Sequence, residues 1–272
     1  LYQLLSPSMF VTRSPRSYNS QIGVPLSVWL MNEQTQVGVF EAGISMPGEM
    51  LALRDIIQPT IAVLTNLGAA HQENFSSMEE KCREKLILFH DAETVIYDGD
   101  DEVISKVIAD YPDYKGEKLF WSLKNAEAPF YVKNIEKQQS VSVITYIYKG
   151  VEDSFSIPFI DDASVQNAII SAVVASKLGL SAEDIDKRMA QLEPVAMRLE
   201  VKVGQHGCTL INDSYNSDIN SLDIALDFMN RRPDHRGRRH TLILSDIYQS
   251  GQAPEALYKE VSDLARKRGV VK

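Results

Sequence analysis

The sequence predicts an α/β protein whose mostly parallel sheet is flanked by helices and carries an antiparallel β appendage. Short apolar runs such as residues 37–42 and 60–65 alternate with helical stretches in the first part of the chain. Strands that alternate with helices are typical of a parallel sheet covered on its faces. Farther along, β-rich segments follow one another with only turns between them, which indicates antiparallel strands. Strands and helices then alternate again, as in the start of a second, Rossmann-like α/β domain.

The first part of the chain supplies the parallel strands and their helices. Strands are expected at Met9–Thr12, 37–42, 60–65 and Thr94–Tyr97. Helices are expected at Gly23–Asn32, Pro47–Ile57, Ser76–Phe89 and Asp101–Ala109. Pro25 lies near the first turn of its helix, where a missing N–H costs nothing. Ser76 or Ser77 would cap a later helix, with Glu79 or Glu80 at the capping-box position.

The second part begins with the β-rich segments. These are Lys118–Ser122, Phe130–Ile135, Val141–Tyr148 and Ser154–Phe159. Helices follow at Ser164–Leu178 and Ala182–Gln191, the latter capped by Ser181. A boundary in the segment Leu192–Leu199 then divides the chain into expected domains at 1–198 and 199–272. The second domain, which is short for a doubly wound fold, has its elements at Glu200–Val203, Cys208–Asn212, Ser217–Met229, Thr241–Ser245 and Pro254–Arg268.

Composition restricts the class of protein. Hydrophobic residues make up 44% and charged residues 24% of the chain, as in ordinary globular proteins. The net charge of −9 argues against a nucleic-acid-binding surface. No apolar run has the length of a membrane span. Cys82 and Cys208 form no framework of spaced cysteines, which favours a reducing cytoplasm. We therefore expect a cytoplasmic protein with neither nucleic acid nor membrane as partner.

The beginning of the chain indicates a fragment. Leu1-Tyr-Gln-Leu-Leu5 has the pattern of the last turns of a helix already under way. The Gly-x-x-x-x-Gly-Lys-Ser/Thr loop that binds nucleotide phosphates in many sheets of this type is absent from the sequence, and no other Gly-rich loop replaces it.

Polar residues at two strand ends predict a metal–phosphate site. Glu41 lies at the end of the expected strand 37–42, Thr65 ends the next apolar run, and Asn66 and His71 follow it. In open parallel sheets, ligands bind just outside the carboxyl ends of the strands. Glu41 is either a solvated carboxylate or a ligand of Mg²⁺, which prefers one or two carboxylates, waters and phosphates. His71 is either an incidental loop histidine or a member of the same site.

Among single residues, Lys85 is the strongest candidate for a functional role. It lies in a helix whose apolar side contains Met78, Cys82, Leu86 and Phe89, so its stem is expected to be partly buried. It could be a lysine that extends its ammonium group to solvent. Alternatively, desolvation lowers its pKa. A neutral amine can add CO₂ to become a carbamate, which is an anionic metal ligand.

Other candidates lie near the expected domain boundary. Asn167, early in a helix, either faces solvent or hydrogen-bonds a base edge. Arg198 is either a surface ion-pair partner or a phosphate ligand. The polar run Asn212-Asp-Ser-Tyr-Asn-Ser217 ends a strand, and Asn216 or Ser217 would cap the next helix. The same run also lies where an α/β domain places ligand contacts.

Taken together, these segments resemble the Mur ligases, the ATP-dependent enzymes that form amide bonds in peptidoglycan synthesis. The segments that carry the resemblance are Ser17-Tyr-Asn-Ser-Gln-Ile-Gly-Val-Pro25, Glu41-Ala-Gly43, Thr65-Asn-Leu-Gly-Ala-Ala-His-Gln-Glu-Asn-Phe75, Arg83-Glu-Lys85, Gln166-Asn-Ala168, Pro194-Val-Ala-Met-Arg198 and Asn212-Asp-Ser-Tyr-Asn-Ser217. Each is weak alone, but their order and spacing are specific. The Asp-Ser-Tyr-Asn segment resembles the members that add D-alanyl-D-alanine. Lysine- or diaminopimelate-adding members and folylpolyglutamate synthases carry other segments there.

The resemblance implies a role for each candidate. Glu41 and His71 would bind Mg²⁺ together with Lys85 as a carbamate. Asn167 would contact adenine, and Arg198 and Asp213 would contact the rest of ATP. The residues implied in binding substrates are Asn19, Ser20, Gln21, Thr65, Asn66, Tyr215, Asn216 and Ser217. The cofactors would be ATP and Mg²⁺, and the substrates UDP-N-acetylmuramoyl-tripeptide and D-alanyl-D-alanine, joined through an acyl phosphate.

Some positions depart from the family pattern. Ala163-Ser164 stands where the family usually has His-Asn, and Ser245-Asp246-Ile247 stands where it has Gly-Asp-Met. The family's phosphate loop would lie upstream of Leu1, so this chain alone is expected to be inactive. The segment from Ser245 to Gly251 resembles forms fused to an alanine racemase.

The sequence alone leaves three alternative functions open. One is a metal-dependent hydrolase that uses Glu41, His71 and a carbamylated Lys85. Another is a Mur-type ligase that adds a different amino acid. The third is a binding or scaffold role without turnover.

Overall fold

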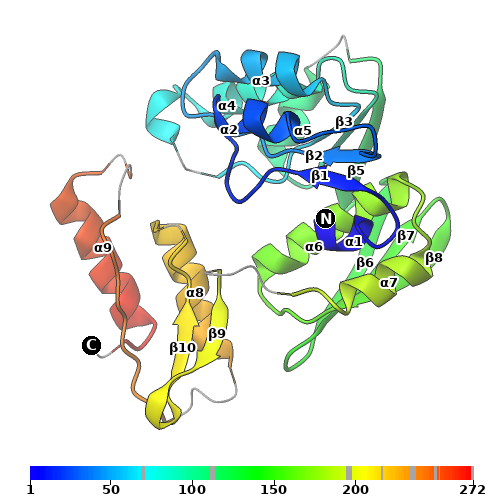
Figure 1. The fold of residues 1–272 in the computed structure, drawn as a ribbon. Coiled ribbons are helices and arrows are strands. Elements are labelled where there is room, and N and C mark those ends of the chain that lie inside the picture. The colour runs from blue at the N-terminus through cyan, green and yellow to red at the C-terminus, as the bar shows by residue number, and fades with distance from the viewer. Residues whose placement is uncertain are drawn as a thin grey trace. The chain divides into compact units, whose positions relative to one another are not determined.

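The computed structural model describes residues 1–68, 71–110, 114–193, 198–215, 217–232, 237–247, 250 and 252–270. The chain divides into two compact units, Leu1–Leu192 and Glu193–Lys272. Figure 1 shows their ribbons, with the first unit in blue to green and the second in yellow to red. Each unit has its own hydrophobic core, so each is described separately.

A six-stranded mixed sheet forms the centre of the first unit. Its order is β3-β4-β5-β6-β7-β8. The strands are β3 (Ile61–Val63), β4 (Thr94–Asp98), β5 (Glu117–Ser122), β6 (Phe130–Lys137), β7 (Ser142–Tyr148) and β8 (Val151–Ile157). Pairing is parallel from β3 to β6 and antiparallel from β6 to β8. The predicted parallel sheet with an antiparallel extension is therefore confirmed.

One strand was grouped wrongly. The segment Lys118–Ser122 was predicted among the antiparallel strands, yet β5 pairs in parallel with both β4 and β6. Composition cannot distinguish the two cases, because β-branched and aromatic residues favour either kind of strand. The direction of β5 follows from the helix before it, since a parallel partner requires a crossover connection.

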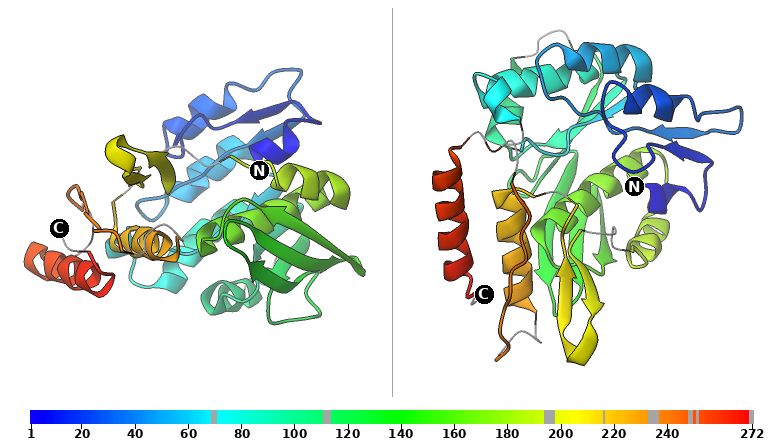
Figure 2. Two further views of the ribbon diagram at one scale, coloured as in Figure 1. Left: turned by 90° about the horizontal axis from the view of Figure 1, so that it is seen from below. Right: turned by 60° about the vertical axis from the view of Figure 1, so that its left-hand side comes forward.

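Helices and a short strand pair complete the first unit. The strand pair is parallel and consists of β1 (Val11–Arg13) and β2 (Val37–Val39). The helices are α1 (Tyr2–Leu5), α2 (Gly23–Val28), α3 (Glu49–Ile57), α4 (Met78–Leu86), α5 (Glu102–Ala109), α6 (Asp162–Lys177) and α7 (Ala182–Met189), with 3₁₀ turns η1 (Gln72–Asn74) and η2 (Ile87–Phe89). Figure 2 shows the green strands β6–β8 beside α6 and α7.

Predicted caps are confirmed at two helices. The Ser77 hydroxyl accepts a hydrogen bond from the Glu80 amide at 3.1 Å and so begins α4. The Ser181 hydroxyl accepts one from the Asp184 amide at 3.1 Å and begins α7. Such side chains satisfy amides that have no partner inside the helix.

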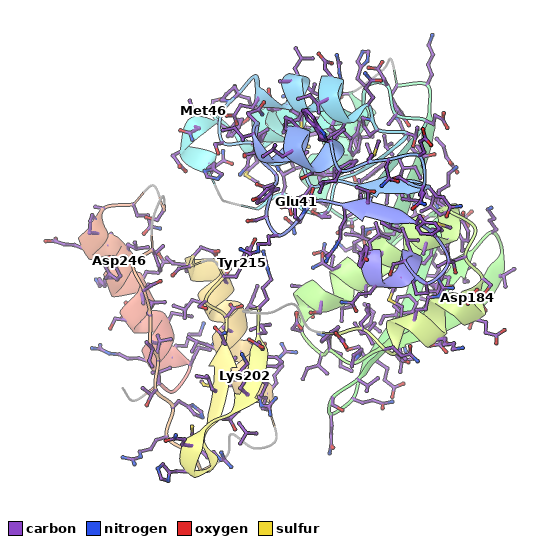
Figure 3. The ribbon with its side chains drawn as sticks, viewed as in Figure 1. Glu41, Met46, Asp184, Lys202, Tyr215 and Asp246 are labelled. Carbon is purple, nitrogen blue, oxygen red and sulfur yellow. The ribbon has the colours of Figure 1, made fainter. Side chains whose placement is uncertain are left out.

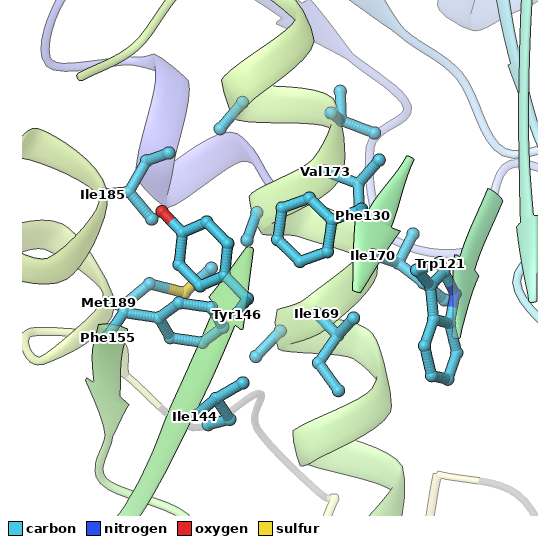
Figure 4. Close-up of a cluster of buried hydrophobic side chains, with 14 of the residues drawn as sticks. Trp121, Phe130, Ile144, Tyr146, Phe155, Ile169, Ile170, Val173, Ile185 and Met189 are labelled. Atoms are coloured by element: carbon cyan, nitrogen blue, oxygen red, sulfur yellow. The ribbon is translucent and has the colours of Figure 1, made fainter. Parts of the chain in front are cut away.

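The core against the antiparallel part is rich in aromatic rings. Phe130 and Tyr146 stack with ring centroids 4.6 Å apart. Side chains of α6 and α7, among them Val173 and Met189, close this core from the helical side (Figure 4). A separate cluster joins α4 and α5 to β3 and β4, and it includes Cys82. Helix α4 is thus packed against β3 and β4 through this cluster.

The second unit consists of a hairpin, two helices and an extended segment. Strands β9 (Glu200–Val203) and β10 (Thr209–Asn212) are antiparallel and joined through η3 (Gln205–Gly207), and helices α8 (Ile219–Arg231) and α9 (Pro254–Lys267) follow. Helix α8 begins after Asp218, whose carboxylate accepts from the Ser221 amide at 2.9 Å. The predicted helix start at Ser217 was therefore two residues early, and Asp218 rather than Asn216 or Ser217 is the cap, because an aspartate competes well for the cap position.

The strand predicted at Thr241–Ser245 is wrong. The described residues of this segment form no strand and pair with neither β9 nor β10. Its alternating pattern has a different cause. Leu242 and Leu244 pack against the cluster formed by α8 and α9, whereas Ile243 is 90% exposed.

Candidate active site

The loop after β2 brings two predicted residues together. Glu41 lies two residues beyond the end of β2, exposed to solvent (Figure 3). Its carboxylate accepts a hydrogen bond from the Asn19 amide side chain at 2.9 Å, and its backbone amide donates to the Ser14 hydroxyl at 3.1 Å. Asn19, predicted to face the peptide substrate, therefore orients the predicted metal ligand.

The backbones of these two loops also run close together. The Gly43 amide donates to the Asn19 carbonyl at 2.8 Å. A Cβ atom at Gly43 would lie 3.1 Å from the Asn19 side-chain nitrogen, which is tighter than an ordinary contact. Glycine at this position thus permits the approach that places Asn19 against Glu41.

Ser20 and Gln21 make local structural contacts. The Ser20 hydroxyl accepts from the Gly23 amide at 3.2 Å, at the beginning of α2. The Gln21 side chain donates to the Glu49 carbonyl at 2.9 Å and so ties this loop to α3. Ser20 itself is exposed. Their predicted contacts with a substrate stay predictions.

Lys85 lies half-buried on the last turn of α4. Burial lowers the pKa of its amine, whereas the Glu41 carboxylate acts in the opposite direction. A Cys82 thiolate would also oppose this shift, but burial raises the pKa of the Cys82 thiol to about 12, so the thiol carries no charge at neutral pH. Glu41 is therefore the relevant anion near Lys85, and the structure brings these two predicted residues within electrostatic reach.

His71 begins the turn η1 with a left-handed backbone, at a φ of 60°. Its charge is the smallest of the effects that lower the pKa of Glu49, after hydrogen bonds from the Met46 and Ser45 amides. In the described part of the chain, no three His, Cys, Asp or Glu side chains gather as a metal site. A shared ligand set of Glu41, His71 and Lys85 therefore stays a prediction.

Thr65 and Asn66 are exposed just beyond the carboxyl end of β3. This is the edge of the sheet where the sequence predicted them. Both side chains are accessible to a ligand there. Their contacts with a substrate stay predictions.

A hydrogen-bond network that the sequence did not reveal fixes the loop after Glu41. The Glu49 carboxylate accepts from the Ser45 and Met46 amides at 2.6 and 3.0 Å. The Asn74 side chain donates to the Ser45 carbonyl at 2.9 Å. Figure 3 shows Met46 farther along this loop than Glu41. The only signal in the sequence was the glycine–glutamate pair at the start of α3.

Glu84 and Lys81 are two further residues that the sequence analysis missed. One Glu84 oxygen accepts from the Gly48 and Met50 amides, at 2.8 and 3.1 Å, and so holds the beginning of α3 on α4. Lys81 is only 2% exposed, more deeply buried than Lys85 one helical turn later. The four-residue spacing of the two lysines, on one face of a helix, was the available signal.

Asn167 is exposed in the second turn of α6. The neighbouring Gln166 donates to the Asp98 carboxylate at 3.2 Å, at the carboxyl end of β4. Burial raises the pKa of Asp98, and the hydrogen bond from Gln166 partly opposes this. This contact brings Asn167 to the same edge of the sheet as the strand-end loops.

The predicted residues of the second unit also lie close to one another. The Arg198 guanidinium stacks over the Tyr215 ring, 4.4 Å from its centroid. Asp213 accepts a hydrogen bond from the Leu199 amide at 3.0 Å. The Ser217 hydroxyl is buried and has no hydrogen-bond partner among the residues that the structure describes. Asn216 lies outside the described residues.

The sequence predicts that the protein does not act at a membrane, and the helices provide one observation on this point. Across the described ranges, none of the helices combines the length and apolar character needed to cross a bilayer.

Known proteins are similar to this chain in sequence and in fold. The model of the Mur ligase middle domain matches residues 1–175. The UDP-N-acetylmuramoyl-tripeptide–D-alanyl-D-alanine ligase of Bacillus subtilis is 26% identical over 263 residues, which cover 96% of this chain and 55% of the relative. The same enzyme of Escherichia coli is 24% identical over 260 residues, covering 93% and 55%. The chain thus spans about half the length of these relatives.

Solved structures show the same fold. A MurF crystal structure from Acinetobacter baumannii has a TM-score of 0.82 at 21% identity, covering 98% of this chain and 57% of that one. The MurF ligase of Thermotoga maritima in complex with ADP has a TM-score of 0.78 at 20% identity, covering 97% and 60%.

Proposed function

The chain belongs to the Mur ligase family, and from this premise we propose that it forms part of an ATP-dependent amide ligase. Residues 1–198 would be the central ATP-binding domain, and 199–272 would be part of the C-terminal domain. The observation that carries the proposal is the position of Thr65, Asn66 and Asn167 at the carboxyl ends of β3 and β4, with Glu41 after β2 within electrostatic reach of Lys85. Ligands of open α/β sheets bind at this edge.

The proposed substrates are UDP-N-acetylmuramoyl-tripeptide and D-alanyl-D-alanine. The names of the curated relatives support both, since they describe a ligase that joins these two molecules. The segment Asp213-Ser-Tyr-Asn-Ser217 supports the dipeptide in particular. Tyr215 is partly exposed and stacked by Arg198, so its ring is held in place for a ligand. We expect the enzyme to act in the cytoplasm, where ATP and UDP-linked precursors are available.

The chemistry of the donor set fits Mg²⁺. Glu41 offers an exposed carboxylate whose orientation is fixed by Asn19. Mg²⁺ takes one or two carboxylates and fills its remaining positions with water and phosphate oxygens. Lys85, half-buried near Glu41, would supply a second anionic group as a carbamate, and His71 would complete the set. The metal would neutralise charge between the substrate carboxylate and the phosphates.

The nucleotide would lie between these loops and the first turns of α6. Asn167 is exposed there and would hydrogen-bond the adenine edge. Arg198 would contact ATP from the domain boundary, and Asp213 would contact it from the C-terminal domain. The Thermotoga maritima MurF ligase, which has a similar fold and was crystallised in complex with ADP, supports the proposal that this chain binds a nucleotide.

The proposed reaction has two steps. An oxygen of the tripeptide's terminal carboxylate attacks the γ-phosphorus of ATP, and ADP leaves. The amine of D-alanyl-D-alanine then attacks the acyl carbon, loses a proton and displaces phosphate. Positioning of the reacting groups and stabilisation of the developing charge supply most of the catalysis in reactions of this kind.

Phosphate release tests this proposal. We expect the full-length protein that carries this sequence to release phosphate from ATP only when both the muramoyl tripeptide and D-alanyl-D-alanine are present. Replacement of the dipeptide by lysine or diaminopimelate serves as the matched control and should give no release. Release that ignores the dipeptide would favour the metal-dependent hydrolase, and release with another amino acid would identify a different Mur-type ligase.

A further inference from the structure

Lys81 is a buried lysine at the centre of α4. Only 2% of its surface is exposed, although lysine is almost never fully buried unless its charge is paired. Neighbouring Cys82 and Leu86 anchor the same helix in the core, at 0% and 1% exposure. The ammonium group is therefore held on a rigid element.

The surroundings of Lys81 come from the loop before the helix. We define the β3–α4 loop as residues 64–68 and 71–77. The Lys81 Nζ donates to the Gly68 carbonyl at 2.6 Å and lies 6.0 Å from the centroid of the Phe75 ring. Burial lowers the pKa of the Lys81 amine, the charge of Lys85 acts in the same direction, and the nearby Glu73 carboxylate opposes both. Gly68, Glu73 and Phe75 of this loop thus lie near the Lys81 side chain.

Lys81 and Lys85 serve different loops from the same face of α4. Residues four apart in a helix are neighbours on its surface. Lys81 contacts the loop that contains Thr65, Asn66 and His71, whereas Lys85 lies within electrostatic reach of Glu41 in the loop after β2. Helix α4 therefore holds one lysine near each of two loops, the β3–α4 loop and the loop after β2.

Stability does not explain the presence of a lysine here. Burial of its ammonium group costs desolvation free energy, which an apolar side chain of similar volume would not incur. An apolar side chain, however, cannot donate a hydrogen bond to the Gly68 carbonyl and so cannot hold that carbonyl in place. The lysine is thus better explained by the position of the loop than by the stability of the fold.

We propose that Lys81 is a positioning residue, which fixes the β3–α4 loop, and with it His71, relative to Lys85. This role deepens the proposed function and rests on it for its catalytic consequence. Partners outside the first set of metal ligands commonly change metal affinity by about 10–100-fold when they are replaced. Its structural consequence, an ordered loop, can be measured without any activity.

Amide hydrogen exchange of the Lys81→Met variant tests the structural part. Methionine keeps an unbranched side chain and removes the charge and its donors. We expect exchange in peptides from 64–77 to rise by about tenfold, while β4 and β5 keep their protection. Lys106→Met is the matched control, since Lys106 has a side chain 65% exposed and pairs only at the surface with Glu79. Unchanged exchange in the loop would overturn the proposal, and so would a rise spread evenly over the whole chain.

Magnesium dependence tests the catalytic part. In the full-length protein, Lys81→Met should raise the Mg²⁺ concentration for half-maximal phosphate release by about tenfold, with an unchanged KM for D-alanyl-D-alanine. A lower maximal rate at an unchanged Mg²⁺ requirement would overturn the positioning role. If wild-type protein shows no ligase activity, the proposed function fails, whereas the exchange result still decides whether Lys81 holds the loop.

Discussion

Asn19 and Glu41 show how a single contact can serve a site. The hydrogen bond of 2.9 Å leaves the Glu41 carboxylate exposed but restricts its orientation. Gly43 makes the approach possible because a Cβ atom would crowd the Asn19 side chain. A ligand whose position is already fixed loses less freedom on binding a metal.

At the residue scale, the first prediction concerns Lys85. The Lys85→Ala variant should lose ligase turnover by roughly a hundredfold or more, because the site would lack its second anionic ligand. A short carboxylic acid should restore part of the activity, since it can occupy the space of the carbamate. Bicarbonate should not, because alanine has no amine to carbamylate. Wild-type turnover in Lys85→Ala, measured as phosphate release, would rule out the carbamate role.

The sequence predicted which polar residues lie beyond strand ends better than it predicted which side chains are buried. The positions of Glu41, Thr65 and Asn66 beyond strand ends followed from the apolar runs before them. Lys81 escaped notice because a lysine in an amphipathic helix normally marks the solvent face. Its burial depends on a loop that folds back over the helix, and such a tertiary contact leaves no periodic pattern. The contact between Asn19 and Glu41 escaped for the same reason.

At the element scale, α3 and α4 are joined through one carboxylate. Glu84 accepts from two amides at the beginning of α3, where the helix would otherwise have unsatisfied donors. Negative charge is also favourable at a helix N-terminus. The loop after Glu41 is therefore held between two helices whose relative position Glu84 fixes.

The second prediction is that Glu84→Ala destabilises the chain. We expect the free energy of unfolding in urea to fall by about 1–2 kcal/mol, the usual effect of losing a helix cap or a charged acceptor. Glu102→Ala, at an exposed position in the first turn of α5, should change it by less than about 0.5 kcal/mol. Equal effects of the two substitutions would show that Glu84 has no special role in holding α3.

Element types were largely predictable, and the errors have physical causes. Caps at Ser77 and Ser181 and the apolar runs of the parallel strands followed local rules that the fold obeys. The direction of β5 depends on its neighbours rather than on its own residues. The segment Thr241–Ser245 has the composition of a strand, yet strand formation requires a hydrogen-bonding partner. Among the described residues of the second unit, β9 and β10 pair with each other, and the segment at 241–245 pairs with neither.

At the scale of the whole molecule, the chain combines a mixed sheet unit with a smaller α/β unit. The match to the Mur ligase middle domain covers residues 1–175, which lie within the first unit. The curated relatives extend over about twice the length of this chain, with 55% of the Bacillus subtilis enzyme covered. The full reaction is therefore best examined in the full-length protein that carries this sequence.

The transfer of an oxygen atom tests the central claim most directly. UDP-N-acetylmuramoyl-tripeptide would be labelled with oxygen-18 in its terminal carboxylate and incubated with ATP, Mg²⁺, D-alanyl-D-alanine and the full-length protein. An acyl phosphate route predicts that each released phosphate carries one labelled oxygen from the peptide, because the oxygen that attacks phosphorus leaves with it. Unlabelled phosphate, as water-driven hydrolysis of ATP would give, would contradict an acyl phosphate ligase.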